Sequence, residues 1–173
     1  GGGSAAALCG SLSAALSSMV ANLTAGKKGH ESVAAIMKST AVRSQKLKEE
    51  LLTAVDQDSR AFNRVMEALR LPKGTPEQVR DREEAIEKAN KEATLVPLSV
   101  LEKSVELAAL AGEVASHRHK SSVSDAGVAG LTARACGSGA YYNVKINLPG
   151  IKDEVFKKKV LNQADKFNKK LEK

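Results

Sequence analysis

The first 26 residues carry no charged side chain, and most of them are Gly, Ala, Ser or Leu. Apolar side chains recur there every three or four residues, the spacing of one helix face; they are Leu8, Leu12, Leu16, Met19 or Val20, and Leu23. A membrane span or signal peptide is not expected, because hydroxyl and amide side chains interrupt the segment and no basic stretch opens it. We expect a buried central helix whose small residues let other helices approach closely.

The rest of the chain is helical in pattern as well. Only 3% of the 173 residues are aromatic and none is Trp, which favours helices packed through small residues over a β sandwich or barrel. We expect further helices over residues 31–71, from Pro76 through Pro97 to about residue 115, over residues 126–142, and from residue 154 onward. Pro97 lacks a backbone donor and should kink its helix. The fold class is therefore all-α, a single domain over residues 1–173 with about five helices, one of them long.

Capping residues predict where several of these helices begin. Thr75 precedes Pro76 in a helix start with Thr at the N-cap, Pro next and Gln78 two residues further on. Ser124-Asp125 is expected to cap the fourth helix and Asp153 the last one. Residues 143–148 are compatible with a helix end, an extended connector or a short strand.

One acidic residue falls inside the apolar stripe of the second helix, which is formed by Leu47, Leu51, Val55, Phe62, Val65, Met66 and Leu69. At roughly 100° per residue, Leu51 and Phe62 lie within about 40° of Asp58, whereas Asp56 lies about 160° away on the polar face. An inward carboxylate has to be hydrogen-bonded, paired or protonated. Asp58 is therefore either structural, bonded to an Arg or to a helix N-terminus, or a proton-transfer residue.

The segment Gly1-Gly2-Gly3-Ser4 leads directly into the first helix. It presents free backbone N–H groups at the positive end of a helix dipole, where a carboxylate or an electron-rich heterocycle could dock. Ser4 is a natural N-cap. The alternative is a flexible terminus.

The charged and metal-binding residue types indicate little specific chemistry. The net charge of +7 suggests an anionic partner, but the basic residues are spread out and many fall between Lys157 and Lys173, so an ordinary basic surface is the alternative. No aromatic residues are interleaved with them, and nucleic acid is not expected as a partner. Cys9 and Cys136 lie far apart, and the histidines at 117 and 119 fall in an expected loop, so neither a disulfide nor a metal site is expected.

Four segments, in order, resemble the cyclodeaminase domain of the formiminotransferase-cyclodeaminase family. They are GGGSAAALCGSLSAALSSMVANLT, VDQDSRAFNRVMEALRLPKGTPE, KEATLVPL and SDAGVAGLTARACGSGAYYNVKINLPGIKDEVF, and together the resemblance covers essentially the whole chain. The family also includes stand-alone cyclodeaminases and methenyltetrahydrofolate cyclohydrolases, so the resemblance indicates the ligand class better than the reaction. The transferase half and the short segment that usually precedes GGGS are absent, as expected of a fragment or a trimmed chain.

The resemblance implies a cytoplasmic, all-helical homodimer that binds a tetrahydrofolate derivative as substrate, with no cofactor, metal or membrane. In the cyclodeaminase reaction, N10 of 5-formimidoyltetrahydrofolate attacks the formimino carbon, and the tetrahedral intermediate expels ammonia to give 5,10-methenyltetrahydrofolate. This chemistry depends on proton transfer. The acid proposed for the family lies four positions before the Phe of its motif, which is Asp58 here, and apolar surroundings would favour proton uptake by this residue.

Other residues of the matching motifs are expected to bind the substrate. They are Gly1, Gly2, Gly3 and Ser4 at the glycine-rich turn, and Asp125, Asn143 and Asn147, which could bond the pterin edge or act as caps and loop contacts. Lys27, Lys28 and Lys145 could meet a glutamate or polyglutamate tail, or could be ordinary surface charges.

Three functions remain open. The first is formimidoyltetrahydrofolate cyclodeaminase. The second is methenyltetrahydrofolate cyclohydrolase, which adds water to the same carbon and needs the same proton transfer. The third is a folate-binding scaffold without catalysis, for which an inward acid at position 58 is not required.

Overall fold

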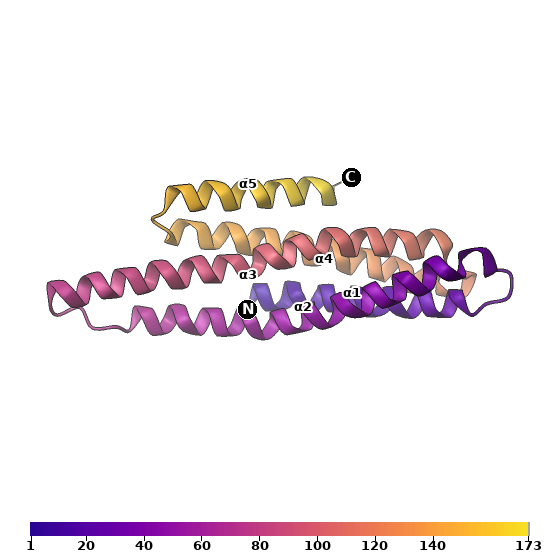
Figure 1. Ribbon diagram of the computed structural model, residues 1–173, viewed down its shortest axis with the longest axis horizontal. Coiled ribbons are helices and arrows are strands. Elements are labelled where there is room, and N and C mark those ends of the chain that lie inside the picture. Colours follow the sequence, from indigo (N-terminus) through magenta and orange to yellow (C-terminus); the bar gives the residue numbers. More distant parts are fainter. Residues whose placement is uncertain (173) are drawn as a thin grey trace.

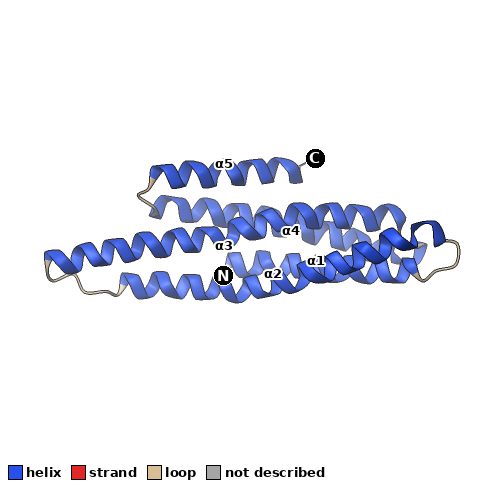
Figure 2. Cartoon of the chain, in the orientation of Figure 1, coloured by secondary structure: helices blue, strands red, loops and turns tan. Residues whose placement is uncertain are grey.

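The computed structural model describes residues 1–172, and within this range every regular element is a helix (Figures 1 and 2). The five main helices are α1 (Gly2–Ala25), α2 (Ala34–Leu69), α3 (Pro76–His117), α4 (Val123–Asn147) and α5 (Glu154–Leu171), with 3₁₀ turns η1 (Glu31–Val33), η2 (Lys120–Ser122) and η3 (Leu148–Gly150) between them. The all-α fold class with five main helices is therefore confirmed.

The first four helices form an antiparallel bundle whose members differ in length. Helices α1 and α4 have 24 and 25 residues, whereas α2 and α3 have 36 and 42. At 1.5 Å per residue, α2 is about 18 Å longer than α1. Helices α2 and α3 therefore continue past the N-terminus as a two-helix hairpin, while α5 lies outside the bundle against α3 and α4 (Figure 1).

Helix α1 lies between its neighbours as expected, but it buries the face opposite to the leucine stripe. Its buried residues are small or β-branched, namely Gly3, Ala6, Ala7, Gly10, Ser11, Ser13, Ala14, Ser17, Ser18, Val20, Ala21 and Thr24. Leu12 is 52% exposed, and Leu8, Met19 and Leu23 are exposed as well. Close packing explains this arrangement, because a Cβ added to Gly10 would lie 2.7 Å from Cys136 Sγ and 3.0 Å from Leu51.

By length and composition, α1 is also the one helix of the described residues that could cross a membrane. More than half of its most apolar window is buried inside the protein. It packs against α2, α3 and α4, which is the environment of a core helix.

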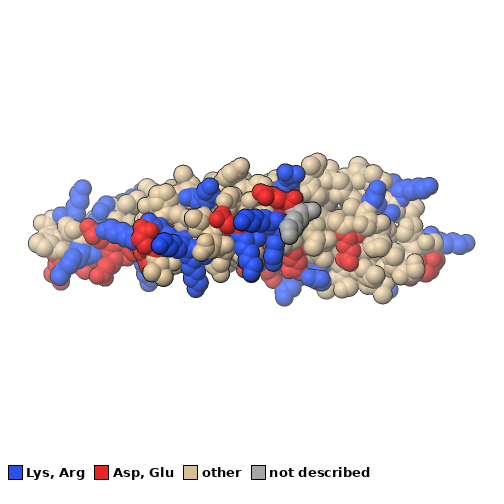
Figure 3. Space-filling model, turned by 90° about the horizontal axis from the view of Figure 1, so that it is seen from above, with Lys and Arg blue, Asp and Glu red and all other residues tan. Residues whose placement is uncertain are grey.

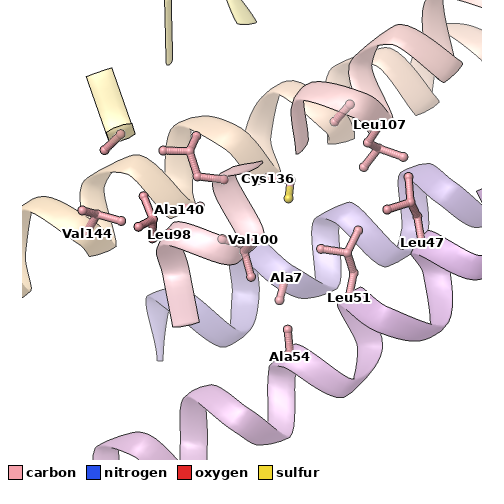
Figure 4. Packing of buried hydrophobic residues seen from close by; sticks show 14 of the residues in the cluster. Ala7, Leu47, Leu51, Ala54, Leu98, Val100, Leu107, Cys136, Ala140 and Val144 are labelled. Carbon is pink, nitrogen blue, oxygen red and sulfur yellow. The ribbon is translucent and has the colours of Figure 1, made fainter. Parts of the chain in front are cut away.

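The main core lies where α1 to α4 meet (Figure 4). Ala7 of α1 faces Leu51 and Ala54 of α2, with Val100 of α3 and Cys136 of α4 around them. The apolar face expected for α3 after Pro97 is confirmed, since Leu98 and Leu101 are buried.

The second half of the predicted α2 stripe is wrong at two of its four positions, whereas Val65 and Met66 are half-buried. Beyond Val55, α2 buries Ala61 and Ala68, whereas Phe62 is 62% exposed and Leu69 is exposed too. The reason is that α1 begins near this level, so beyond it α2 packs mainly against α3, and alanines are its fully buried residues there.

Local capping signals predict some helix starts and miss others. Thr75 Oγ1 accepts a hydrogen bond from the Gln78 N–H at 3.2 Å, and Asp153 Oδ1 accepts one from the Phe156 N–H at 3.0 Å, so both predicted caps are confirmed. The predicted Ser124-Asp125 cap is wrong, because α4 begins at Val123, directly after η2, and both residues therefore lie inside the helix. The strand alternative for residues 143–148 is wrong as well, since α4 continues to Asn147.

Helix α5 is anchored by charged groups of α3. Glu87 accepts hydrogen bonds from the backbone N–H groups of Lys152 at 2.8 Å and Asp153 at 3.1 Å, and Lys91 Nζ lies 2.7 Å from Asp153 Oδ2. The hydrogen bond from Lys91 holds the pKa of the Asp153 carboxyl below its ordinary value of 3.8. The basic residues of α5 lie on the face that Figure 3 views, among other charges of both signs.

Acid should weaken this anchor. Because the folded-state pKa of Asp153 is lowered, its contribution to stability is present above about pH 3.8 and is lost as the pH falls through the folded-state pKa. We expect Lys91→Met to lower the melting temperature at pH 7 more than at pH 3, measured by circular dichroism. An equal effect at both pH values would show that the ion pair does not stabilise the folded state.

Candidate functional site

A cavity of about 550 Å³ lies at the N-terminal end of α1, at the level beyond which α2 and α3 continue as a hairpin. All four bundle helices line it. The lining residues are Gly1, Gly2, Gly3, Asp58, Ser59, Phe62, Asn63, Val65, Asn90, Ala93, Asn143 and Asn147. The glycine-rich turn, Asp58 and two of the expected asparagines are thus brought together from distant parts of the chain.

Asp58 is hydrogen-bonded to the first turn of α1. Its Oδ2 accepts one hydrogen bond from the Ser4 backbone N–H at 2.8 Å and another from Ser4 Oγ at 2.7 Å. The prediction of Ser4 as N-cap is wrong: Gly1 is the N-cap and has no side chain, so Asp58 supplies the acceptor that a capping residue usually provides. The carboxylate also lies at the positive end of the α1 dipole.

The glycines allow this close contact. A Cβ on Gly3 would overlap the Asp58 carboxylate, and one on Gly2 would lie 3.1 Å from Asn143 Nδ2. Gly2 and Gly3 are already helical. The glycine-rich segment is therefore the ordered start of α1, and it packs closely against α2 and α4. The flexible-terminus alternative is wrong.

Three asparagines with oriented amides form much of the polar wall. Asn90 Nδ2 donates to the Gly150 carbonyl at 2.7 Å, Asn143 Nδ2 to the Gly139 carbonyl at 2.8 Å, and Asn147 Nδ2 to the Ala93 carbonyl at 3.0 Å. Only the NH₂ side of an amide can donate to a carbonyl, so these bonds define which side of each amide carries the acceptor oxygen.

The surroundings of Asp58 differ from the expected apolar ones. The residue is half-buried, its hydrogen-bond partner is Ser4, and Ser59 and Asn63 line the same cavity. Asp56 is exposed, as expected. The inward position of Asp58 is thus compatible with the structural alternative, a bond to a helix N-terminus, and it also places the carboxylate at a cavity.

Besides Ser4, whose hydroxyl bonds to Asp58, four predicted binding residues are not among the residues that line this cavity. Asp125 is 18 residues before Asn143 on α4, a distance of about 27 Å along the helix. Lys145 extends over the Tyr141 ring, with 5.3 Å between Nζ and the ring centroid. Lys27 and Lys28 follow α1 at the end of the bundle opposite to the cavity. A binding role for these four residues stays a prediction.

Six lining residues were not singled out for binding by the sequence, and two of them, Asn90 and Phe62, have side chains that suit a ligand. Asn90 comes from a charged stretch of α3 and carries no local signal. Phe62 was expected in the core, but its exposed ring offers an aromatic surface beside Asp58. The shorter length of α1 is consistent with this position, because Phe62 lies on α2 close to where α1 begins.

The arrangement combines one carboxylate, several amides and an aromatic ring. Amides can pair with the donor and acceptor groups at the edge of a flat heterocycle, and the ring can stack on its face. The carboxylate can accept and return a proton. Among residues 1–172, no group of three His, Cys, Asp or Glu side chains is close enough to hold a metal ion.

Comparisons with known proteins agree on one family. A family model described as formiminotransferase-cyclodeaminase matches residues 1–166. A methenyltetrahydrofolate cyclohydrolase from Methylorubrum extorquens is 41% identical over 165 residues, which are 95% of this chain and 79% of that protein. A formimidoyltransferase-cyclodeaminase from Gallus gallus is 40% identical over 157 residues, which are 91% of this chain but only 29% of that protein.

The fold has a solved relative as well. The crystal structure of a formiminotetrahydrofolate cyclodeaminase from Thermotoga maritima superposes with a TM-score of 0.87 and 30% sequence identity. The match covers 99% of this chain and 82% of that one.

The packing of Gly3 against Asp58 predicts an unusual effect of alanine. In an ordinary helix, Gly→Ala stabilises by up to about 1 kcal/mol, but at Gly3 the overlap with the carboxylate should reverse the sign and cost about 1–3 kcal/mol. Denaturant unfolding of Gly3→Ala measures this. Gly1→Ala is the matched control, because its Cβ would meet nothing within 4 Å; a stabilised Gly3→Ala would contradict the packing argument.

Proposed function

Because this chain belongs to the formiminotransferase-cyclodeaminase family, we propose that it acts on a tetrahydrofolate derivative at the carbon between N5 and N10. The reaction that we propose first is that of a methenyltetrahydrofolate cyclohydrolase, which adds water to 5,10-methenyltetrahydrofolate and yields 10-formyltetrahydrofolate. Asp58 is the proposed proton-transfer residue. The observation that carries this proposal is the position of its carboxylate at the cavity, held by Ser4.

The order of the two reactions differs from the one that the sequence alone favoured. The relative named as a cyclohydrolase is 41% identical over 95% of this chain, and bifunctional relatives from Gallus gallus and Sus scrofa are 40% and 35% identical over 91% and 92% of it. Cyclodeaminase remains the second candidate, and the fold match to the cyclodeaminase from Thermotoga maritima supports it. Both reactions pass through a tetrahedral carbon that carries N5, N10 and the incoming or departing group.

The hydrogen bonds of Asp58 suit a base. Both groups of Ser4 donate to Oδ2, whereas within residues 1–172 no group donates a hydrogen bond to Oδ1, which lies beside Gly3 and is the oxygen that takes the proton in this proposal. In the proposed reaction, a water oxygen bonds to the methenyl carbon while Asp58 takes one water proton. The bond from this carbon to N5 then breaks, N5 takes the proton from Asp58, the hydroxyl proton leaves to solvent, and a formyl group remains on N10.

The rest of the cavity suits a pterin. Phe62 offers a face on which the bicyclic ring can stack, and Asn90, Asn143 and Asn147 offer oriented amides for its donor and acceptor edge. The cavity of about 550 Å³ falls within the usual range of 300–1,000 Å³ for small-molecule sites.

We also propose that the protein is a homodimer. Helices α1 and α4 pack side by side, since the buried Ser13 Oγ of α1 donates to the Ala129 carbonyl of α4 at 2.7 Å, and both helices have exposed apolar residues. Leu12 and Leu131 on these helices are 52% and 71% exposed. Large exposed apolar surfaces of this kind are typical of interfaces.

The proton-transfer role predicts the outcome at position 58. Asp58→Asn keeps an acceptor oxygen for the Ser4 N–H, so the fold should survive, but the amide cannot take a proton and turnover should fall by roughly 10²–10⁴-fold. The absorbance of methenyltetrahydrofolate measures both reactions: its loss reports the cyclohydrolase, and its formation from 5-formimidoyltetrahydrofolate reports the cyclodeaminase.

Asp56→Asn is the matched control and should be close to wild type, because Asp56 is exposed on the other side of α2. An Asp58→Asn protein with a lower melting temperature and full activity per folded molecule would leave Asp58 as a helix cap alone. A wild-type protein that binds tetrahydrofolate and turns over neither substrate would support the scaffold alternative.

The proposed interface predicts a change of mass. Leu12→Lys or Leu131→Lys should convert the dimer to a monomer of 18.2 kDa, because a charge would be buried without a partner. Leu52→Lys is the control, since Leu52 is also 52% exposed but lies on α2. Light scattering that gives one mass for all of these proteins would contradict the α1/α4 interface.

A further inference from the structure

Pro97 leaves a backbone acceptor free inside α3. It is fully buried and lies within the uninterrupted helix Pro76–His117. A proline has no N–H, so the carbonyl four residues earlier, that of Ala93, loses its partner within the helix. Ala93 lines the cavity, so this turn of α3 belongs to the wall of the candidate site.

Asn147 supplies the missing donor from another helix. Its Nδ2 donates to the Ala93 carbonyl at 3.0 Å, across 54 residues of sequence. Among residues 1–172, no group donates a hydrogen bond to Asn147 Oδ1, and the residue lines the cavity. The bond to Ala93 therefore fixes the amide plane and leaves its acceptor oxygen for a ligand.

We propose that Asn147 is a positioning residue of the folate cavity whose amide is oriented by the carbonyl that Pro97 leaves free. The ligand in this inference rests on the proposed function, whereas the coupling of Pro97 to Asn147 does not. An ordinary residue at position 97 would supply the missing N–H and compete with Asn147 for the Ala93 carbonyl. Pro97 would then matter for ligand binding although its own side chain lies in the core.

A merely structural role makes a different prediction. If Asn147 only satisfies the Ala93 carbonyl, then Pro97→Ala should be harmless, because the backbone N–H that this substitution introduces would satisfy the carbonyl equally well. If Asn147 is held in place for the ligand, the same substitution should release its amide and weaken substrate binding. The substitution of a proline by the best helix former thus separates the two roles.

The test is a double-mutant cycle of Pro97→Ala and Asn147→Leu in the full chain. Alone, Asn147→Leu leaves a carbonyl unpaired and should raise the equilibrium constant for unfolding roughly 5- to 150-fold. In the Pro97→Ala background, the same change should have a clearly smaller effect. Asn22→Leu is the control, since Asn22 Nδ2 bonds to the Ser18 carbonyl within α1, away from Pro97 and the cavity, and its effect should be the same in both backgrounds.

Kinetics supply the second readout. Pro97→Ala should raise KM for methenyltetrahydrofolate about tenfold, the effect of one lost hydrogen bond, with kcat nearly unchanged because Asp58 keeps its contacts. Pro97→Ser offers the same N–H if the alanine variant does not fold. Asn147→Asp, which keeps an acceptor but loses the donor, should also raise KM.

Two results would overturn the inference. Additive unfolding free energies in the cycle would show that Pro97 does not hold Asn147, and an unchanged KM in Pro97→Ala would reduce Asn147 to a structural contact. Wild-type protein that turns over neither folate would overturn the proposed function alone, since the unfolding cycle still decides the coupling.

Discussion

The close packing around α1 is the constraint on which the rest of the structure depends. Three helices contact α1 at once, and its inward face accommodates them only because it has no residue larger than Val. At Gly10, even a methyl group would meet Cys136 and Leu51. The leucines of α1 consequently point outward, and the spacing of α2 and α4 at the cavity follows from the same close approach.

The candidate site arises where this packing stops. Because α1 is 12 residues shorter than α2, its first turn is left at mid-height of the bundle, with N–H groups that need an acceptor. Asp58 meets that need and is thereby held at the cavity. The Asp58 carboxylate therefore stabilises the start of α1 and is also the proposed proton-transfer group, and the glycines make room for it in both roles.

The sequence predicts features that depend on neighbouring residues and misses those that depend on distant ones. The caps at Thr75 and Asp153 are local, and both are correct. The helical period of α1 is also local, but it does not reveal which face is buried when the small residues form the tighter contact. Asp58 was singled out by its place in a stripe, yet its partner Ser4 lies 54 residues away. Asn90 had no signal at all, because its role comes from the meeting of α3 with the turn at Gly150.

The order of the helices along the chain has a consequence for biosynthesis. Of the five helices, α1 is synthesised before the others, and α4, which covers one side of it, begins about 100 residues later. At 5–20 residues per second, this interval lasts roughly 5–20 s. During that time α1, which is apolar enough to cross a membrane by length and composition, is not yet covered by α4. Chaperones that shield nascent chains should therefore bind at α1 in the interval before α4 has been synthesised.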